Sequence, residues 1–129
     1  MSYAVGDELP PFTIVSVSPE AMKQWAVFLA DPNPIHLDVE VVKAKGLGDR
    51  VINQGPINVA YMMNMLMQAF PGGTIKAMDS RFLDNVYGGD SAVVTGKVTA
   101  IEGNAVTCEF ALDVKGRGTV NAGTAIVQI

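Results

Sequence analysis

The sequence has few of the side chains that hold metal ions or form disulfides. Its 129 residues include one cysteine, Cys108, and one histidine, His36. A lone cysteine excludes an internal disulfide, and one cysteine with one histidine is too small a ligand set for a zinc site of the usual kind. Cys108 lies in the middle of a segment that alternates apolar and polar residues, which predicts a small, buried hydrophobic residue.

Charge is also scarce. Charged residues make up 17% of the chain and hydrophobic residues 49%, with a net charge of -4. Nucleic acid and anionic membranes bind a basic surface, so neither is expected as the main partner. The apolar composition predicts either an extensive interior or a surface covered by a second subunit, which favours an oligomer. The length fits one domain, spanning residues 1–129.

The first residues, 1–8, have no basic segment followed by an apolar core, which is the pattern of a secretory signal. We therefore expect a cytoplasmic protein. The most apolar run, residues 56–70, would form a helix about 22 Å long, which is too short to cross a bilayer. A Pro-Gly-Gly sequence at 71–73 ends that run.

The first half of the chain predicts a short strand and three helices. Residues 12–17 are typical of a strand, and Ser18 with Pro19 forms a strong helix start. Apolar residues then recur with helical spacing, at Met22, Trp25, Ala26 and Leu29. A short helix is predicted at 39–44 and a longer one at 56–70.

The predicted helix at 56–70 is apolar on nearly every face, so we expect other parts of the fold to surround it. Its distinctly polar residues are Asn58, Asn64 and Gln68. A methionine cluster in it could line an acyl pocket, but methionine more often fills a core, and we favour the core interpretation. The cluster consists of Met62, Met63, Met65 and Met67.

The second half predicts consecutive strands, within 74–86 and at 91–101, 106–115 and 119–129, separated by short glycine-containing turns. Short turns favour antiparallel neighbours. An apolar helix followed by antiparallel strands is accommodated economically when the sheet curls around the helix. The sequence therefore predicts an α+β protein of the hot-dog architecture, with the sheet wrapped around a central helix.

The segment between the first two predicted helices carries the chemistry. Asp31 and Asn33 each precede a proline, which disfavours helix, so the segment is predicted to be stiff and extended. A bend at the prolines can bring Asp31 and His36 to face one small volume, where the pair could hold and deprotonate a water. On residue types alone a structural role stays open, because Asp-Pro and Asn-Pro are common in loops and a single histidine is often structural.

Residues 28–38, Phe-Leu-Ala-Asp-Pro-Asn-Pro-Ile-His-Leu-Asp, closely match a known motif. It consists of an aromatic residue, a small-residue step and then Gly-Asp-x-Asn-Pro-Ile/Leu-His-x-Asp. On this basis the sequence resembles the MaoC-like hydratases, the hot-dog family of (R)-specific enoyl-CoA hydratases and hydroxyacyl-thioester dehydratases. The resemblance extends to residues 5–10, 52–55, 80–82 and 88–90.

The resemblance implies a hydro-lyase of fatty acid metabolism that adds water to trans-2-enoyl thioesters. It implies His36 as the catalytic base and Asp31 as the residue that holds water and donates a proton. It also implies that the Gly55 amide binds the thioester oxygen, with Asn33 and Gln54 as further substrate-site positions. No cofactor or metal is expected, because the thioester itself activates the double bond. The acyl thioester is the expected partner, and a homodimer is the expected assembly.

Two positions depart from the family pattern. Ala30 stands where the family often has glycine, and Gln54-Gly55-Pro56 stands where His-Gly-Met is common. The second change removes a histidine beside the start of the apolar helix, which bears on substrate orientation and pocket shape. Pro56 suits a first helical position.

Other functions stay open at this stage. A hot-dog thioesterase would use a carboxylate to activate water against the carbonyl, and Gln54 also suggests a non-catalytic acyl-binding or heterodimer subunit. A serine hydrolase is disfavoured because no Gly-x-Ser-x-Gly segment occurs. A calcium loop beginning at Asp31 would need glycine at His36 and glutamate at Val42. Candidates for coenzyme A phosphate binding are Arg50, Lys76 and Arg81, for which solvated surface charge is the alternative interpretation.

Overall fold

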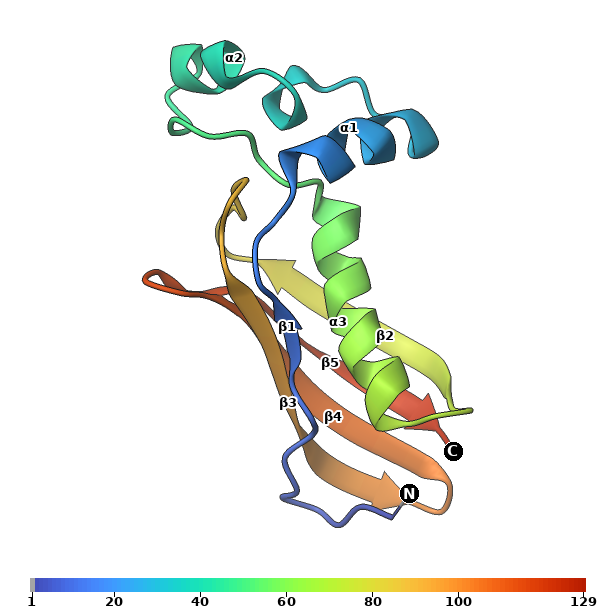
Figure 1. Cartoon of the computed structure of the whole chain (residues 1–129). Helices are drawn as coiled ribbons and strands as arrows, with labels where there is room; N and C mark the ends of the chain where they lie inside the picture. Colours follow the sequence, from blue (N-terminus) through green and yellow to red (C-terminus); the bar gives the residue numbers. More distant parts are fainter. Residues whose placement is uncertain (1) are drawn as a thin grey trace.

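One antiparallel sheet packs its inner face against a long helix in the computed structural model, which describes residues 2–129 (Figure 1). The elements in chain order are β1 (Phe12–Ile14), α1 (Pro19–Phe28), the 3-10 helix η1 (Pro34–His36), α2 (Val39–Ala44), α3 (Gly55–Ala69), β2 (Thr74–Phe82), β3 (Ala92–Glu102), β4 (Ala105–Val114) and β5 (Gly118–Gln128). The predicted combination of an apolar helix and antiparallel strands is confirmed. No helix in residues 2–129 is both long and apolar enough to span a membrane.

The strands lie in the order β1-β3-β4-β5-β2. The turns at 102–104 and 116–118 join β3 to β4 and β4 to β5 as antiparallel neighbours, as their lengths predict. β2 follows α3 and pairs with β5 at the far edge of the sheet. β1 is shorter than the predicted strand at 12–17, because the chain leaves the sheet after Ile14 and Val17 N–H donates instead to Asp90 O.

The core lies between α3 and the sheet. The alternation predicted for residues 106–115 is confirmed, because every second side chain of β4 is buried. These residues are Val106, Cys108, Phe110, Leu112 and Val114. The helix contributes a buried stripe of Ile57, Asn58, Met62, Met65, Leu66 and Ala69.

The prediction that α3 would be surrounded is wrong for one of its faces. Met63 and Met67 are 41% and 40% exposed, whereas Met62 and Met65 are fully buried. The core interpretation therefore holds for two of the four methionines. The physical reason is that the sheet of one chain covers α3 from one side and does not close around it (Figure 1).

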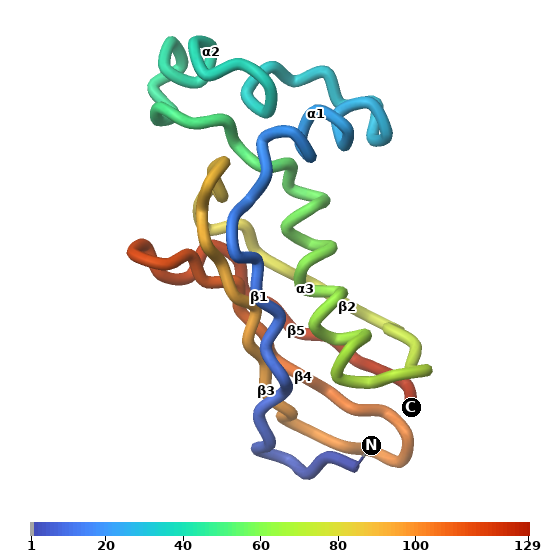
Figure 2. The backbone as a smooth tube through the Cα atoms, viewed as in Figure 1, coloured from blue at the N-terminus to red at the C-terminus, as the bar shows by residue number. Residues whose placement is uncertain are grey.

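The segments α1, η1 and α2 gather beyond the first turn of α3, at one end of the sheet (Figure 2). α1 begins as predicted, with Ser18 Oγ accepting from Ala21 N–H at 3.1 Å and Pro19 in the first helical position. Of its predicted apolar stripe only Met22 is fully buried, while Trp25 is 38% exposed. This end of the molecule holds the Asp/His segment against the start of α3.

Candidate active site

Asp31 and His36 face each other. Oδ2 of Asp31 lies 3.2 Å from Nε2 of His36. The His36 side chain is 8% exposed and that of Asp31 is 32% exposed, so the histidine is held in the interior while the carboxylate reaches solvent. The structure therefore brings together the two side chains that the sequence singled out.

Asp31 is oriented by the way α1 ends. Asp31 N–H donates to Ala26 O at 2.9 Å and Ala30 N–H donates to Val27 O at 3.2 Å, which is the Schellman pattern of a helix C-terminus. That pattern needs a left-handed residue at Ala30, and its φ is indeed +51°. The glycine that the family often has at this position is thus explained by backbone geometry, and Ala30 adopts the same conformation with some strain.

The segment after Asp31 is not extended, contrary to the prediction. Pro34, Ile35 and His36 form a single 3-10 turn. Asn33 caps it through Oδ1, which accepts from Ile35 N–H at 3.3 Å, and proline is well suited to a first helical position. The prolines therefore start a turn, and this turn brings His36 back toward Asp31.

Asn33 also fixes the Asp31 carboxylate. Its backbone N–H donates to Asp31 Oδ1 at 3.1 Å. One carboxylate oxygen is thereby held by the backbone, and the other, Oδ2, faces His36. The observed contacts of Asn33 are those of a brace for the loop.

His36 is held in one tautomer. Its Nδ1 lies 2.6 Å from Ile52 O, and a carbonyl oxygen only accepts, so Nδ1 carries the hydrogen. In the neutral ring Nε2 then presents its lone pair toward Asp31. Ile52 N–H in turn donates to Ile35 O at 2.9 Å, so two bonds fasten η1 to the segment before α3.

When the ring is neutral, two acceptors face the same small volume, Nε2 of His36 and Oδ2 of Asp31. A water molecule satisfies such a pair because it can donate one O–H to each. The ring nitrogen can then take a proton from that water, while the carboxylate keeps it in place. The geometry suits activation of water for attack on an electrophile.

The first turn of α3 provides one free hydrogen-bond donor. Pro56 has no N–H, and the N–H groups of Ile57 and Asn58 donate to Gln54 O at 3.0 and 3.3 Å. No side chain caps the helix, so among the described residues Gly55 N–H remains the donor that helix geometry leaves available. The ring of Phe82 lies beside it, because a methyl group at Gly55 would lie 3.3 Å from Phe82 Cε1.

Gln54 is completely buried. Its Nε2 donates to Met22 O at 2.8 Å, which fastens α1 to the start of α3. Its Oε1 is buried without a hydrogen-bond partner. At the position where the family commonly has histidine, this chain thus has an amide that joins two helices.

A mostly apolar pocket of about 600 Å³ adjoins Asp31. Its lining consists of Lys23, Ala26, Val27, Ala30, Asp31, Pro32 and Leu37. Neither His36 nor Gly55 belongs to that lining, so the pocket reaches the pair from the Asp31 side. A larger groove of about 860 Å³ includes Arg81, Lys97 and Glu109 but neither member of the pair.

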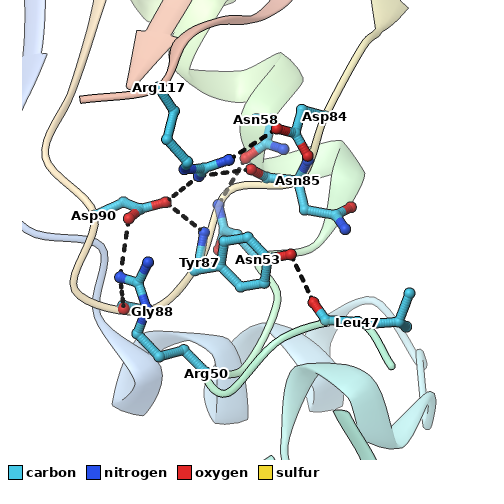
Figure 3. Close-up of polar contacts among 10 residues, drawn as sticks. All are labelled: Leu47, Arg50, Asn53, Asn58, Asp84, Asn85, Tyr87, Gly88, Asp90 and Arg117. Carbon is cyan, nitrogen blue, oxygen red and sulfur yellow. Dashed lines mark hydrogen bonds and ion pairs between the residues drawn. The ribbon is translucent and has the colours of Figure 1, made fainter. Parts of the chain in front are cut away.

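A second polar cluster, which sequence reasoning missed, lies near the start of α3 (Figure 3). Asp90 is 7% exposed and binds Arg50 at 2.9 Å, Arg117 at 2.6 Å and the N–H of Tyr87 at 2.8 Å. Burial alone would raise the pKa of Asp90, but the hydrogen bonds from Tyr87, Arg117 and Arg50 outweigh it and hold the pKa below its usual value.

This cluster includes Arg50, one of the three residues predicted as candidates for phosphate binding. Arg50 donates to Asp90 and to Gly88 O, at 2.9 and 3.0 Å, so its guanidinium is engaged within the fold. Lys76 and Arg81 are exposed on β2. The signal that could have revealed the cluster is the acidic residue in the Gly-Gly-Asp segment, whose local pattern indicates only a turn.

A buried amide pair completes the surroundings of Gly55. Asn53 Nδ2 donates to Asn58 Oδ1 at 2.8 Å and lies 3.3 Å from the Tyr61 hydroxyl. Burial raises the pKa of Tyr61, and the hydrogen bond with Asn53 opposes that rise. Polar side chains therefore occupy the interior at the amino end of α3, although the rest of its buried stripe is mainly apolar.

A family model for the MaoC-like domain matches residues 4–115. The chain belongs to the MaoC-like domain family. The matched residues include Asp31, His36 and Gly55, so the three groups described above all lie within the MaoC-like domain. No curated protein matches the sequence.

Solved structures are similar over nearly the whole MaoC-like chain. An (R)-hydratase from A. caviae involved in PHA biosynthesis has a TM-score of 0.90 at 22% identity, covering 99% of this chain and 98% of that one. The ChsH1-ChsH2 complex from Mycobacterium tuberculosis has a TM-score of 0.88 at 19% identity, covering 99% of both chains.

A more distant likeness is to the fluoroacetyl-CoA-specific thioesterase FlK, solved as a point mutant. Its TM-score is 0.72 at 14% identity, covering 99% of this chain and 88% of that one. At these identities the likeness establishes the fold. The predicted hot-dog architecture of the MaoC-like chain is confirmed.

Proposed function

We propose that this MaoC-like protein is a hydro-lyase that reversibly adds water to trans-2-enoyl thioesters, such as enoyl-CoA, to give (R)-3-hydroxyacyl thioesters. The observation that carries the proposal is the 3.2 Å approach of Asp31 Oδ2 and His36 Nε2 on a loop fastened to the start of α3. The likeness to the A. caviae (R)-hydratase supports the same chemistry and the same stereochemistry.

The addition uses the pair as base and acid in turn. A water held between Asp31 and His36 loses one proton to His36 Nε2, and its oxygen forms a bond to C3 of the enoyl group. The electron pair of the C2=C3 bond moves toward the thioester, which becomes an enolate. One proton then passes from the pair, through Asp31, to C2, so the pair returns to its initial protonation and one water is consumed.

The Gly55 N–H is placed to stabilise the enolate oxygen. It is the donor left available at the positive end of α3, where a developing negative charge is favoured. Glycine at this position leaves the space next to the amide open to the thioester. The thioester itself makes C3 electrophilic, so the proposed reaction needs no cofactor from the protein.

The active assembly in this proposal is a homodimer. Met63 and Met67 are exposed on α3, and β2 is a nine-residue edge strand with one side unpaired in the sheet of a single chain. Both features leave apolar or hydrogen-bonding surface that a second copy can cover. Sedimentation equilibrium is expected to give a mass of about twice 13.6 kDa.

The proposal is tested by incubating the purified protein with trans-2-crotonyl-CoA and following the loss of the enoyl absorbance. The product is expected to be (R)-3-hydroxybutyryl-CoA by chiral chromatography. Asp31→Asn is expected to reduce kcat by about 10²- to 10⁴-fold, the usual contribution of an acid or base. Asp49→Asn, the same change at an exposed position, serves as the control. A protein without activity on any enoyl thioester would contradict the proposal.

A thioesterase is the second candidate, favoured by the likeness to FlK and by the partly exposed carboxylate of Asp31. In that reaction the activated water would attack the thioester carbonyl and release free thiol. Incubation with acetyl-CoA and crotonyl-CoA in the presence of a thiol reagent separates the two. Thiol release would favour the thioesterase, and loss of the enoyl absorbance without thiol release would favour the hydratase.

A non-catalytic subunit is a third candidate, suggested by Gln54, whose side chain serves to join α1 and α3. The solved ChsH1-ChsH2 complex has a TM-score of 0.88, close to the 0.90 of the (R)-hydratase. If this role applies, Asp31→Asn and His36→Ala will leave the activity of the complex with its partner unchanged.

A further inference from the structure

Asn121 of β5 is a fully buried amide with no partner. It is 0% exposed, and neither Nδ2 nor Oδ1 has a hydrogen bond. Buried polar groups in folded proteins are almost always paired, because an unpaired amide loses its hydrogen bonds with water and gains nothing in return. Such a side chain is retained where a ligand or a bound water completes it.

The sheet register aims Asn121 toward the proposed site. Asn121 lies directly across from Phe82 on β2 and from Leu112 on β4. Side chains at directly opposed positions point to the same face of a sheet, and Leu112 is in the core under α3. The ring of Phe82 lies beside Gly55. Asn121 therefore faces the first turn of α3.

The inward-facing side chains of β5 change from apolar to polar at Asn121. The inward residues closer to the carboxyl end of the strand, Ala125 and Val127, are apolar and buried. Around the first turn of α3, Asn58 accepts a hydrogen bond from Asn53, and Gln54 Oε1 is also buried without a partner. The interior beside Gly55 therefore contains hydrogen-bonding groups. A plain hydrocarbon chain would instead be bound best by apolar side chains.

From this arrangement, and resting on the proposed hydratase function, we infer that the acyl group of the substrate carries a neutral oxygen, a hydroxyl or a carbonyl, which hydrogen-bonds to Asn121. An amide has two N–H donors and one acceptor, so it is complementary to either group. Phe82, directly across from Asn121 on β2, is 57% exposed and its ring lies beside Gly55, so one residue of the strand pair joins the thioester site to this amide.

A carboxylate on the acyl group fits less well. A buried negative charge needs a cation, and the two arginines of the neighbouring cluster are already engaged. Arg50 binds Asp90, and Arg117 binds both Asp90 and Asp84. The neutral amide of Asn121 supplies hydrogen bonds without charge, which favours an uncharged oxygen.

The inference is tested by measuring kcat/KM for trans-2-hexenoyl-CoA and for its 4-hydroxy, 5-hydroxy and 6-hydroxy derivatives. At least one hydroxylated substrate is expected to exceed the plain one by about tenfold or more, because a site built to bind an oxygen disfavours the analogue that lacks it. Asn121→Leu is expected to remove this preference, so that the ratio of kcat/KM for the hydroxylated and plain substrates falls to about one. Asn64→Leu, the same change at an exposed position of α3, is the matched control.

The possible results distinguish a failure of the inference about Asn121 from a failure of the proposed hydratase function. If the plain substrate is hydrated as well as every hydroxylated one, the proposed function stands, the inference is overturned and Asn121 merely holds a buried water. The same conclusion follows if folded Asn121→Leu keeps the preference for the hydroxylated substrate. If no enoyl thioester is hydrated at all, the proposed function fails and the inference fails with it.

Discussion

The Nδ1 atom of His36 lies 2.6 Å from the carbonyl oxygen of Ile52, and this bond fixes the ring so that Nε2 faces Asp31. Asparagine can place a donor near Nδ1 but has nothing at Nε2. His36→Asn is therefore expected to keep the fold and to lower kcat by about 10²- to 10⁴-fold. Enoyl hydration kinetics and urea unfolding measure the two effects.

His36→Leu is the comparison for that variant. It removes the donor to Ile52 O as well as the base, so unfolding is expected to become easier by about 1–3 kcal/mol in addition to the loss of activity. Equal stability of the Asn and Leu variants would show that the Ile52 contact does not support the fold.

Gly55→Ala tests the role of the free amide. A methyl group there would lie 3.3 Å from Phe82 Cε1, the end of a side chain that is 57% exposed and can yield. Stability is expected to stay equal or to rise slightly, because alanine is the better helix former. kcat/KM for crotonyl-CoA is expected to fall by about tenfold or more, because the methyl group crowds the oxygen that the amide binds. Unchanged kinetics would place the thioester elsewhere.

Asp90→Asn tests the polar cluster near the start of α3. The variant leaves Arg50 and Arg117 without their shared carboxylate and is expected to lose about 2–4 kcal/mol of unfolding free energy at pH 7. Because the pKa of Asp90 is below its usual value of 3.8, its stabilising effect is complete above that value and is lost as the pH falls below it. The difference between wild type and variant in urea unfolding should narrow below about pH 4. A difference that is constant with pH would contradict this.

Ala30→Gly is expected to stabilise the protein. Ala30 has a φ of +51°, a conformation that is unfavourable for alanine and readily adopted by glycine. A gain of about 0.5–1 kcal/mol is expected after allowing for the greater freedom of glycine in the unfolded chain. Ala26→Gly, in the body of α1, should instead cost about 1 kcal/mol, and thermal unfolding distinguishes the two.

Cys108 is expected to report on global unfolding. It is fully buried in β4, and burial raises the pKa of its thiol to about 11. Only the thiolate reacts with disulfide reagents, so the native protein should react very slowly with Ellman's reagent at about pH 8 and quickly in denaturing urea. Rapid reaction of the native protein would indicate local opening of the sheet.

Much of the secondary structure follows from local signals. Ser18 with Pro19 marks the start of α1, and the alternation around Cys108 marks β4, because caps and period-two patterns are properties of neighbouring residues. The pairing of Asp31 with His36 also follows from one short segment. The 3-10 turn at Pro34 was missed because proline permits both an extended segment and a helical start, and the Asn33 cap decides between them.

The remaining features depend on contacts between distant segments. Gln54 is bound to Met22, 32 residues away, and Arg117 to Asp90, 27 residues away, and neither pairing leaves a local pattern. The exposure of Met63 depends on how far the sheet curls around α3, which the residues of the helix do not determine. The sequence around Asn121 does not indicate a binding residue, because the lack of a hydrogen-bond partner for its side chain is evident only in three dimensions.

The two ends of the described chain lie at the opposite end of α3 from Gly55. Tyr3 donates its hydroxyl to Ala69 O, at the last residue of that helix, and Ile129 N–H donates to Asn104 O in the turn between β3 and β4. α3 is about 22 Å long, so an affinity handle or surface tether attached to either terminus starts roughly that far from the amide. An immobilised protein would therefore present its reactive end to the solution, whichever terminus carries the tether.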